Sequence, residues 1–404
     1  MKKYNYEARD SASNKIVKSV VQAESENAAA KLLTTQGFVP LKIELQDDKT
    51  GFFAKLSGRI TTKDKVVFTR QLATLIGAGL PLSQSLRTVQ EQTTNKRMQE
   101  IVQEIISDVE GGKSLSDSFA KHPEAFNKVY VALVAAGETS GTMDESLKRL
   151  AAQQEKDAAM MSKIRGAMMY PSIVLAVIIL VVGFMLFTVV PQVEGLYRDL
   201  NKGLPFITLI MINVANFFIH FWWLALLIMI IGGYFLVQYL KTEQGIRTKD
   251  AFKLNAPLFK GMFRKMYMAR FSRTGQVLLS TGVPMLDMLR ISSDAVNNVI
   301  ISEGIIRAAD KVKGGKALSA SLSNEEYFLT MVPQMIKIGE QSGKIDEMMG
   351  KTAQVYEDEL DEEIRALSTA IEPVLMVFLA LVAGTMVAAI LLPIYSLVGN
   401  INIH

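Results

Sequence analysis

A glycine-rich acidic motif occurs twice in the chain, and its residues could either hold a metal ion or form a sharp joint. The first copy reads AAGETSGTMDESL over residues 135–147, and the second reads KIGEQSGKIDEMM over residues 337–349. A carboxylate exposed in a loop can bind a divalent cation, so Glu138 is a weak candidate metal ligand. Glycine disfavours a helix interior by about 1 kcal/mol and is common where helices end. The motif therefore favours a joint between two helices.

Most residues assigned to the joint are the same in both copies, although Lys344 stands in the second copy where Thr142 stands in the first. Thr142 is predicted to cap the following helix, with Glu145 three residues later completing a capping box. The two glutamates are expected to tie each joint to a neighbouring helix, through two arginines that are also paired across the copies. The predicted structural and coupling residues are Gly137, Glu138, Gly141, Gly339, Glu340, Gly343, Arg70 and Arg273.

Other motifs that could carry chemistry are incomplete. The stretch GGKS at 111–114 lacks a phosphate loop's first glycine, because Ser107 stands there, and its later copy has Ala317 in place of the hydroxyl. The chain has no cysteine, and its three histidines are far apart in sequence, which argues against a zinc site. We therefore expect no enzyme activity and no cofactor.

Three long uncharged stretches indicate a membrane protein. The chain of 404 residues is 49% hydrophobic yet 21% charged, with a mean hydropathy of +0.22. A helix needs about 20 apolar residues to span the hydrocarbon core of a bilayer. The stretches at 170–191, 217–240 and 372–393 meet this length and contain no charged residue apart from Glu372 at the mouth of the third. No apolar leader follows the first methionine, and a net charge of +4 without a basic run gives no support to nucleic-acid binding.

Lysine and arginine set the expected orientation. Lys163 and Arg165 precede the first stretch, and four basic residues follow the second between 241 and 253. Basic residues are enriched on the cytoplasmic side of membrane spans. The N-terminal region and residues 241–370 are therefore predicted to be cytoplasmic, with the C-terminus external.

An internal repeat defines the domains. FTRQLATLIGAGLPLSQSL at 68–86 aligns with FSRTGQVLLSTGVPMLDML at 271–289, although Gly275 replaces Leu72. We predict a mainly α membrane protein with two homologous cytoplasmic helical-bundle domains, three transmembrane helices and a small N-terminal α/β module. The predicted parts are the α/β module at 1–50, a linker at 51–62, helical domain 1 at 63–168, transmembrane helix 1 at 170–191, an external connection at 192–216, transmembrane helix 2 at 217–240, helical domain 2 at 241–370, transmembrane helix 3 at 372–393 and an external tail at 394–404.

These motifs, in this order, resemble the inner-membrane platform proteins of type IV pili and type II secretion systems. The resemblance covers essentially the whole chain and rests on F-x-R, A/T-G-x-P and G-E-x-S-G-x-x-D in both copies and on E-P-x-L at the last span. It implies a scaffold in the bacterial inner membrane that couples a cytoplasmic hexameric assembly ATPase to pilin or pseudopilin polymerisation. It also implies contacts with other inner-membrane assembly proteins and membrane lipid, and self-association into a homo-oligomer. A three-span transporter or receptor is the alternative.

Two acidic features are candidate partner sites. Glu357, Asp358 and Glu359 lie in a strongly acidic run that could dock a basic partner such as the ATPase. Glu372 stands next to a proline at the mouth of the last span, where it could contact the pilin. Helices running through 144–178 and 346–378 are predicted to join each domain to the membrane without a break.

Overall fold

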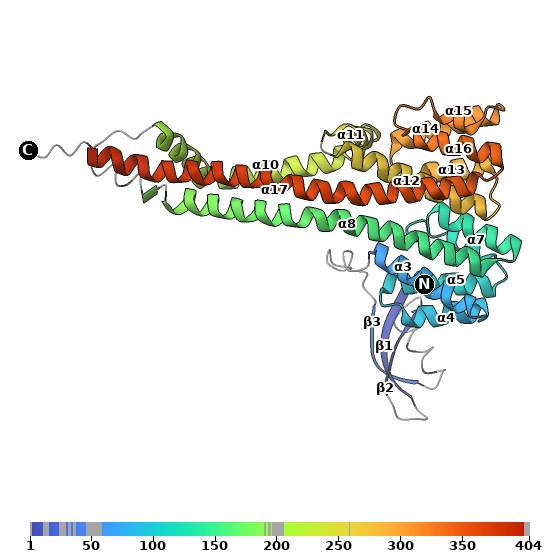
Figure 1. Ribbon diagram of the computed structural model, residues 1–404. Helices are drawn as coiled ribbons and strands as arrows, with labels where there is room; N and C mark the ends of the chain where they lie inside the picture. The colour runs from blue at the N-terminus through green and yellow to red at the C-terminus, as the bar shows by residue number, and fades with distance from the viewer. Residues whose placement is uncertain are drawn as a thin grey trace, which may run out of the picture. The chain divides into compact units, whose positions relative to one another are not determined.

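The structure is a computed structural model that describes residues 2–10, 16–23, 30, 34, 38–45, 59–189, 191–192, 195, 206–257 and 259–399. The chain divides into two units, Met1–Arg59 and Ile60–His404. Figure 1 draws both units.

The first unit contains a three-stranded antiparallel sheet in the order β2-β1-β3. Its strands are β1 (Lys2–Asp10), β2 (Ile16–Ala23) and β3 (Phe38–Leu45). The register places Lys2 opposite Ala23 and Tyr4 opposite Leu45, with an irregularity between Glu7 and Ala8. The three strands fall within residues 1–50, where the sequence predicts the α/β module. Of the helix expected in this module, only Ala30 and Thr34 are described; both are helical, and the Thr34 hydroxyl donates to the Ala30 carbonyl oxygen at 2.8 Å. The rest of that helix lies outside the described residues, so the α/β character of the module stays a prediction.

The second unit begins with a lobe of short helices that pack on one long helix. Thr61 and Asp64 form a capping box at the start of α3, and Asn95 caps α5 by accepting from the Met98 amide. Phe68 lies in the core of this lobe against an aromatic cluster. The elements of lobe 1 are α3 (Thr62–Gly77), α4 (Leu82–Gln92), α5 (Lys96–Glu110), α6 (Leu115–Ala120), α7 (Lys128–Ser140) and the first turns of α8 (Met143–Phe184).

Lobe 2 repeats this order element by element, in agreement with the sequence repeat. One helix, α11 (Glu243–Asn255), precedes the repeat and has no counterpart among the described residues of lobe 1. The remaining elements are α12 (Lys260–Ser280), α13 (Met285–Ala295), α14 (Val299–Lys313), α15 (Leu318–Leu322), α16 (Met331–Ser342) and the first part of α17 (Ile345–Gly399).

The departure from the repeat at Gly275 has a packing explanation. A Cβ atom at Gly275 would lie 2.2 Å from the terminal methyl carbon of Met349. Met349 aligns with Leu147 of lobe 1, so two buried leucines of lobe 1, Leu72 and Leu147, correspond to a glycine and a methionine in lobe 2. Methionine is long and flexible enough to fill space left by a missing side chain.

Two helices are long and apolar enough to cross a membrane. They are Met143–Thr188, in which α8 continues into a short π-helix, η1 (Met185–Val189), and Ile345–Ala388 within α17. The second predicted stretch, 217–240, lies in α10 (Phe206–Tyr239) except for its last residue, and α10 is broken at Phe221. The described residues give a third span only if Leu226–Tyr239 and Glu243–Asn255, which are bent by 93°, count as one span.

Each long helix belongs to a lobe at one end and is apolar at the other (Figure 1). At 1.5 Å per residue, the 55 residues of α17 extend over about 80 Å. Large apolar side chains are exposed along the far ends of both helices, including Leu180 on α8 and Leu381 on α17. The predicted unbroken connection from lobe to apolar segment is therefore present in both copies.

Candidate coupling joints and the contact between the lobes

The duplicated glycine motif forms a tight turn between two antiparallel helices in each lobe. Gly141 ends α7 with φ of 73°, and Gly343 ends α16 with φ of 72°. These are left-handed conformations that only glycine adopts without strain. In both copies the final glycine and the residue after it donate to the carbonyl oxygen of the first glycine, Gly137 or Gly339. The motif thus turns the chain sharply onto α8 or α17.

The first glycine of each motif permits a close helix contact. A Cβ atom at Gly137 would lie 2.8 Å from the hydroxyl oxygen of Ser146, and one at Gly339 would lie 2.7 Å from the Cα of Ile345. Real Cβ atoms do not approach other atoms so closely. Both positions therefore require glycine because the two helices of each hairpin nearly touch.

The glutamate of each motif caps a neighbouring short helix. Glu138 accepts hydrogen bonds from the amides of Leu115 (2.5 Å) and Ser116 (3.0 Å) and from the Ser116 hydroxyl (2.5 Å). Glu340 accepts from the amide (3.2 Å) and hydroxyl (2.5 Å) of Ser319. The first amides of a helix have no partner within it, and an anion there is favoured by the helix dipole. Each glutamate therefore ties its joint to the start of α6 or α15.

The predicted pairing of these glutamates with Arg70 and Arg273 is wrong. Arg70 pairs with Glu155 on α8, and Arg273 pairs with Glu357 on α17. The Arg273 pair is bidentate, with both hydrogen bonds at 2.8 Å. Sequence reasoning missed Glu155, although it aligns with Glu357 at the offset of 202 that relates the two joints. This shared offset is the sequence signal that could have identified Glu155 as the partner of Arg70.

Two other predictions at the first joint need correction. Thr142 precedes α8 but makes no side-chain capping bond, and its hydroxyl lies 2.6 Å from that of Ser140 instead. Both carboxylate oxygens of Glu138 already accept from N–H and O–H groups. Within the part of the chain that the structure describes, no cluster of three or more acidic or histidine side chains could hold a metal ion. The geometry thus gives Glu138 a capping role.

Polar side chains join the two lobes along α8, α12 and α17. Lys156 of α8 lies 3.0 Å from Glu357, and Lys163 lies 2.5 Å from Asp361. The buried amide of Gln153 donates to the hydroxyl of Thr274 on α12 at 3.1 Å. These contacts and the packing of α7 on α13 hold the two long helices side by side.

A groove of about 220 Å³ lies among these contacts. Asp157 lines it, and burial raises the pKa of this carboxyl, with a smaller opposing effect from Arg270. The Arg270 Nε atom is 3.9 Å from the Asp157 carboxylate, which is too long for a hydrogen bond. The contact between the lobes is therefore a network of charged groups.

The acidic run on α17 is mostly engaged within the chain. Glu357 is bound by Arg273 and Lys156, and Glu359 lies 3.1 Å from Lys265. These two carboxylates do not form the free docking face that the sequence predicted. Asp358 is exposed and accepts a hydrogen bond from Gln354 at 2.9 Å. Glu372 is exposed where α17 becomes apolar.

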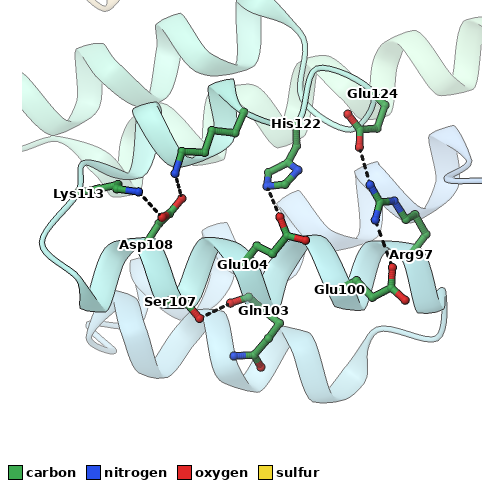
Figure 2. A network of polar contacts seen from close by, with 10 residues as sticks. Arg97, Glu100, Gln103, Glu104, Ser107, Asp108, Lys113, His122 and Glu124 are labelled. Atoms are coloured by element: carbon green, nitrogen blue, oxygen red, sulfur yellow. Dashed lines mark hydrogen bonds and ion pairs between the residues drawn. The ribbon is translucent and has the colours of Figure 1, made fainter. Parts of the chain in front are cut away.

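A second polar network, shown in Figure 2, connects α5 to neighbouring segments of lobe 1. Arg97 on α5 lies 3.2 Å from both Glu100 and Glu124. Asp108, farther along α5, pairs with Lys113 and Lys121, and His122 is 3.5 Å from Glu104. The network ties α5 to the segments on either side of α6. Its charges face one another in pairs, which fits a structural role.

Comparison with known proteins gives consistent matches over the whole chain. The family model described as type II secretion system (T2SS), protein F, matches residues 68–191 and 271–393, and its N-terminal domain model matches residues 1–44. The type IV pilus assembly protein PilC of Thermus thermophilus is 37% identical over 99% of both chains. PilC of Pseudomonas aeruginosa is 36% identical over 91% of this chain and 98% of its own. The type II secretion system protein F of Pseudomonas aeruginosa is 33% identical over 98% and 99%.

Proposed function

The chain belongs to the type II secretion system protein F family, and from this premise we propose that it is the inner-membrane platform of a type IV pilus or type II secretion machine. Relatives named for pilus assembly and relatives named for secretion both match it over nearly their full length. In this proposal the chain is a scaffold, and the duplicated joints are structural corners of that scaffold.

The proposed membrane arrangement has three spans. The far ends of α8 and α17 form the first and third, and the part of α10 after its break at Phe221 forms the second. Exposed apolar side chains along α10, such as Met229 and Phe235, support its contact with lipid. Lysines and arginines are concentrated on the lobe side of all three, with only Arg198 and Lys202 in the connection between the first two, which favours cytoplasmic lobes and an external C-terminus.

The platform is proposed to couple a cytoplasmic hexameric ATPase to the polymerisation of pilin or pseudopilin subunits. The observation that carries this proposal is the continuity of α8 and α17 from the lobes into the apolar segments. Long helices curve gently, with sharp kinks mainly at sites such as proline, and α8 continues as one helix through Pro171. A displacement of the lobes would therefore be transmitted to the bilayer. Further proposed partners are other inner-membrane assembly proteins and a second copy of the chain.

Two acidic residues remain proposed contact points for these partners. Asp358, unlike Glu357 and Glu359, makes no ion pair with a described residue, so it is the member of the acidic run that could meet a basic partner. Glu372 lies at the depth where a pilin helix would leave the bilayer. If Glu372 contacts pilin, Glu372→Gln lowers both filament assembly and crosslinking of pilin to α17. Unchanged crosslinking removes Glu372 from the proposal.

Affinity purification of the tagged full chain from native membranes tests the proposed function. The platform proposal predicts that a hexameric ATPase and a pilin-like subunit are recovered with the chain. Asp358→Lys should reduce recovery of the ATPase but leave the pilin, while an exposed lobe residue such as Glu326→Lys serves as the charge-matched control. Recovery of neither partner under conditions that preserve the chain would contradict the proposal.

A further inference from the structure

A basic groove of about 600 Å³ lies on the side of the lobes that faces the apolar segments. Its lining residues come from the first turn of α3, the middle of α8, the helices α11 and α12, and Asn297. Its volume falls in the range of about 300–1,000 Å³ that is usual for ligand sites. Four cationic side chains line it, from Lys63, Arg165, Lys253 and Arg270, and no carboxylate of a described residue does.

Two of these four charges are balanced by nearby acids. Lys253 lies 3.3 Å from Asp250, and Arg270 lies 3.9 Å from Asp157. Lys63 and Arg165 are exposed, and neither has a carboxylate of a described residue within ion-pair distance. The Nε atom of Arg270 is also buried without a hydrogen-bond partner among the described residues. The groove therefore carries an excess of about two positive charges and an unused donor.

An apolar groove of about 290 Å³ continues from the basic one. Ile164, Lys253 and Phe263 line both, so the two spaces meet along a shared wall. Apart from Lys253, every residue lining the second groove is apolar, including Met168 on α8 and the exposed Phe252 on α11. A ligand that fills both spaces needs an anionic end and an apolar end.

The depth of the two grooves matches the boundary of a bilayer. Arg165 is the last charged residue before the uncharged stretch of α8, and Met168 lies one turn beyond it. The basic groove is therefore at the level of lipid headgroups, and the apolar groove opens toward the acyl chains. Cationic pockets between helices at the cytoplasmic surface suit the phosphates of anionic lipids.

We propose that these adjoining grooves bind one anionic phospholipid, with its phosphate against Arg165 and Lys63 and its acyl chain against Met168 and Phe252. The inference rests on the proposed placement of α8 in the membrane. It does not require an ATPase or a pilin, so it can fail while the platform function stands. A lipid in this position bridges lobe 1, lobe 2 and the first span.

Native mass spectrometry of the detergent-purified full chain tests the proposal. Phosphatidylglycerol, cardiolipin and phosphatidylethanolamine are titrated separately, and the anionic lipids should bind at least about ten-fold more tightly than phosphatidylethanolamine. Each cation near an anionic lipid contributes about five-fold in affinity. The double variant Lys63→Gln/Arg165→Gln should therefore weaken phosphatidylglycerol binding by roughly 25-fold. The single variant Arg165→Lys, which keeps the charge and leaves Lys63 intact, should retain most of the phosphatidylglycerol binding.

Matched controls separate this site from general surface charge. Lys249 and Lys260 are exposed on α11 and α12 and line neither groove, so Lys249→Gln/Lys260→Gln should bind as the wild type does. Phe252→Ser should weaken lipid binding without changing the charge. Equal affinity for phosphatidylglycerol and phosphatidylethanolamine, or full binding by the Lys63 and Arg165 double variant, overturns the proposal. Equally tight binding of glycerol 3-phosphate or inorganic phosphate overturns it as well, because the ligand is then a soluble anion.

Discussion

Arg273 and Glu357 are joined by two hydrogen bonds of 2.8 Å, from the Nε and Nη2 atoms of the guanidinium to the two carboxylate oxygens. Arg70 and Glu155 form the equivalent pair in lobe 1. Each pair connects the first helix of a lobe to its long helix. We call each of these arginine–glutamate pairs a clamp. The clamp is duplicated together with the joint, and the two features fix the lobe end of α8 and α17.

The two clamps should differ in their contribution to stability because they differ in exposure. The Arg273 and Glu357 side chains are 15% and 21% exposed, whereas those of Arg70 and Glu155 are 57% and 35% exposed. Removing one partner of a half-buried charged hydrogen bond costs about 1.5–3 kcal/mol, and an exposed pair contributes about 0.2–1 kcal/mol. Arg273→Ala should therefore lower the thermal midpoint of the purified protein more than Arg70→Ala does. Equal losses would show that burial does not decide the strength of the clamp.

The first glycine of each joint should not tolerate alanine. Gly339→Ala would place a Cβ atom 2.7 Å from the Cα of Ile345, so α16 and α17 must separate. Overpacking of this kind costs about 1–3 kcal/mol, more than the gain of about 1 kcal/mol in helix propensity. Gly77→Ala is the control, since a Cβ atom there meets nothing within 4 Å. Thermal unfolding in detergent should show a loss for Gly339→Ala and no loss for Gly77→Ala; a neutral Gly339→Ala would argue against the close approach.

The capping role of Glu138 predicts no dependence on divalent cations. Glu138→Gln should destabilise lobe 1 by about 1 kcal/mol because a neutral amide is a weaker cap for α6. A chelator such as EDTA should leave the thermal midpoint of the wild type unchanged. If the chelator lowers the midpoint of the wild type but not that of Glu138→Gln, the carboxylate is a metal ligand and the capping account is incomplete.

Lobe 2 should lose stability in acid through Glu325. Burial by itself would raise the pKa of Glu325, but hydrogen bonds from Arg307 and Lys311 outweigh it and hold the pKa below its usual value of 4.5. The stabilisation is therefore complete above about pH 5 and is lost as the pH falls through the lowered pKa. Glu325→Gln should be less stable than the wild type at pH 7, and the difference should shrink toward pH 3. Its exposed neighbour is the control, and Glu326→Gln should follow the wild type at every pH.

Much of the fold could be predicted because its signals are local or repeated. Thr61, Asn95 and Pro81 mark helix starts, and the repeat offset relates each element of lobe 2 to one of lobe 1. The partner of Glu138 could not be predicted, because Ser116 is 22 residues away and is brought to it only by the fold of α6 against α7. The lysine contacts between the lobes, such as that of Lys156 with Glu357, have no equivalent in the repeat and therefore no signal in it.

The acidic run on α17 shows why charge composition alone does not identify a free docking surface. A run such as Glu357 to Glu359 is usually a solvated helix face, yet here basic residues of α8 and α12 neutralise two of its three carboxylates. Those cations, Lys156, Lys265 and Arg273, come from distant parts of the chain. Only the packed lobes place them opposite the run.

The central claim is that stiff helices transmit movement from the lobes to the bilayer, and replacing a short piece of α17 by glycine tests it most directly. Ser368, Thr369 and Ala370 lie between the lobe and the apolar segment, are exposed or half-buried, and line neither lipid groove. Changing all three to glycine costs about 1 kcal/mol of helix stability per residue relative to alanine, without changing the length of α17. The double variant Ser368→Ala/Thr369→Ala removes the same hydroxyl groups, keeps Ala370 and the Cβ atoms, and is the control. We predict that the triple-glycine chain reaches the membrane and still recovers the ATPase, but that filament assembly or secretion falls at least about ten-fold while the double-alanine chain works normally. Wild-type assembly by the triple-glycine chain would contradict it.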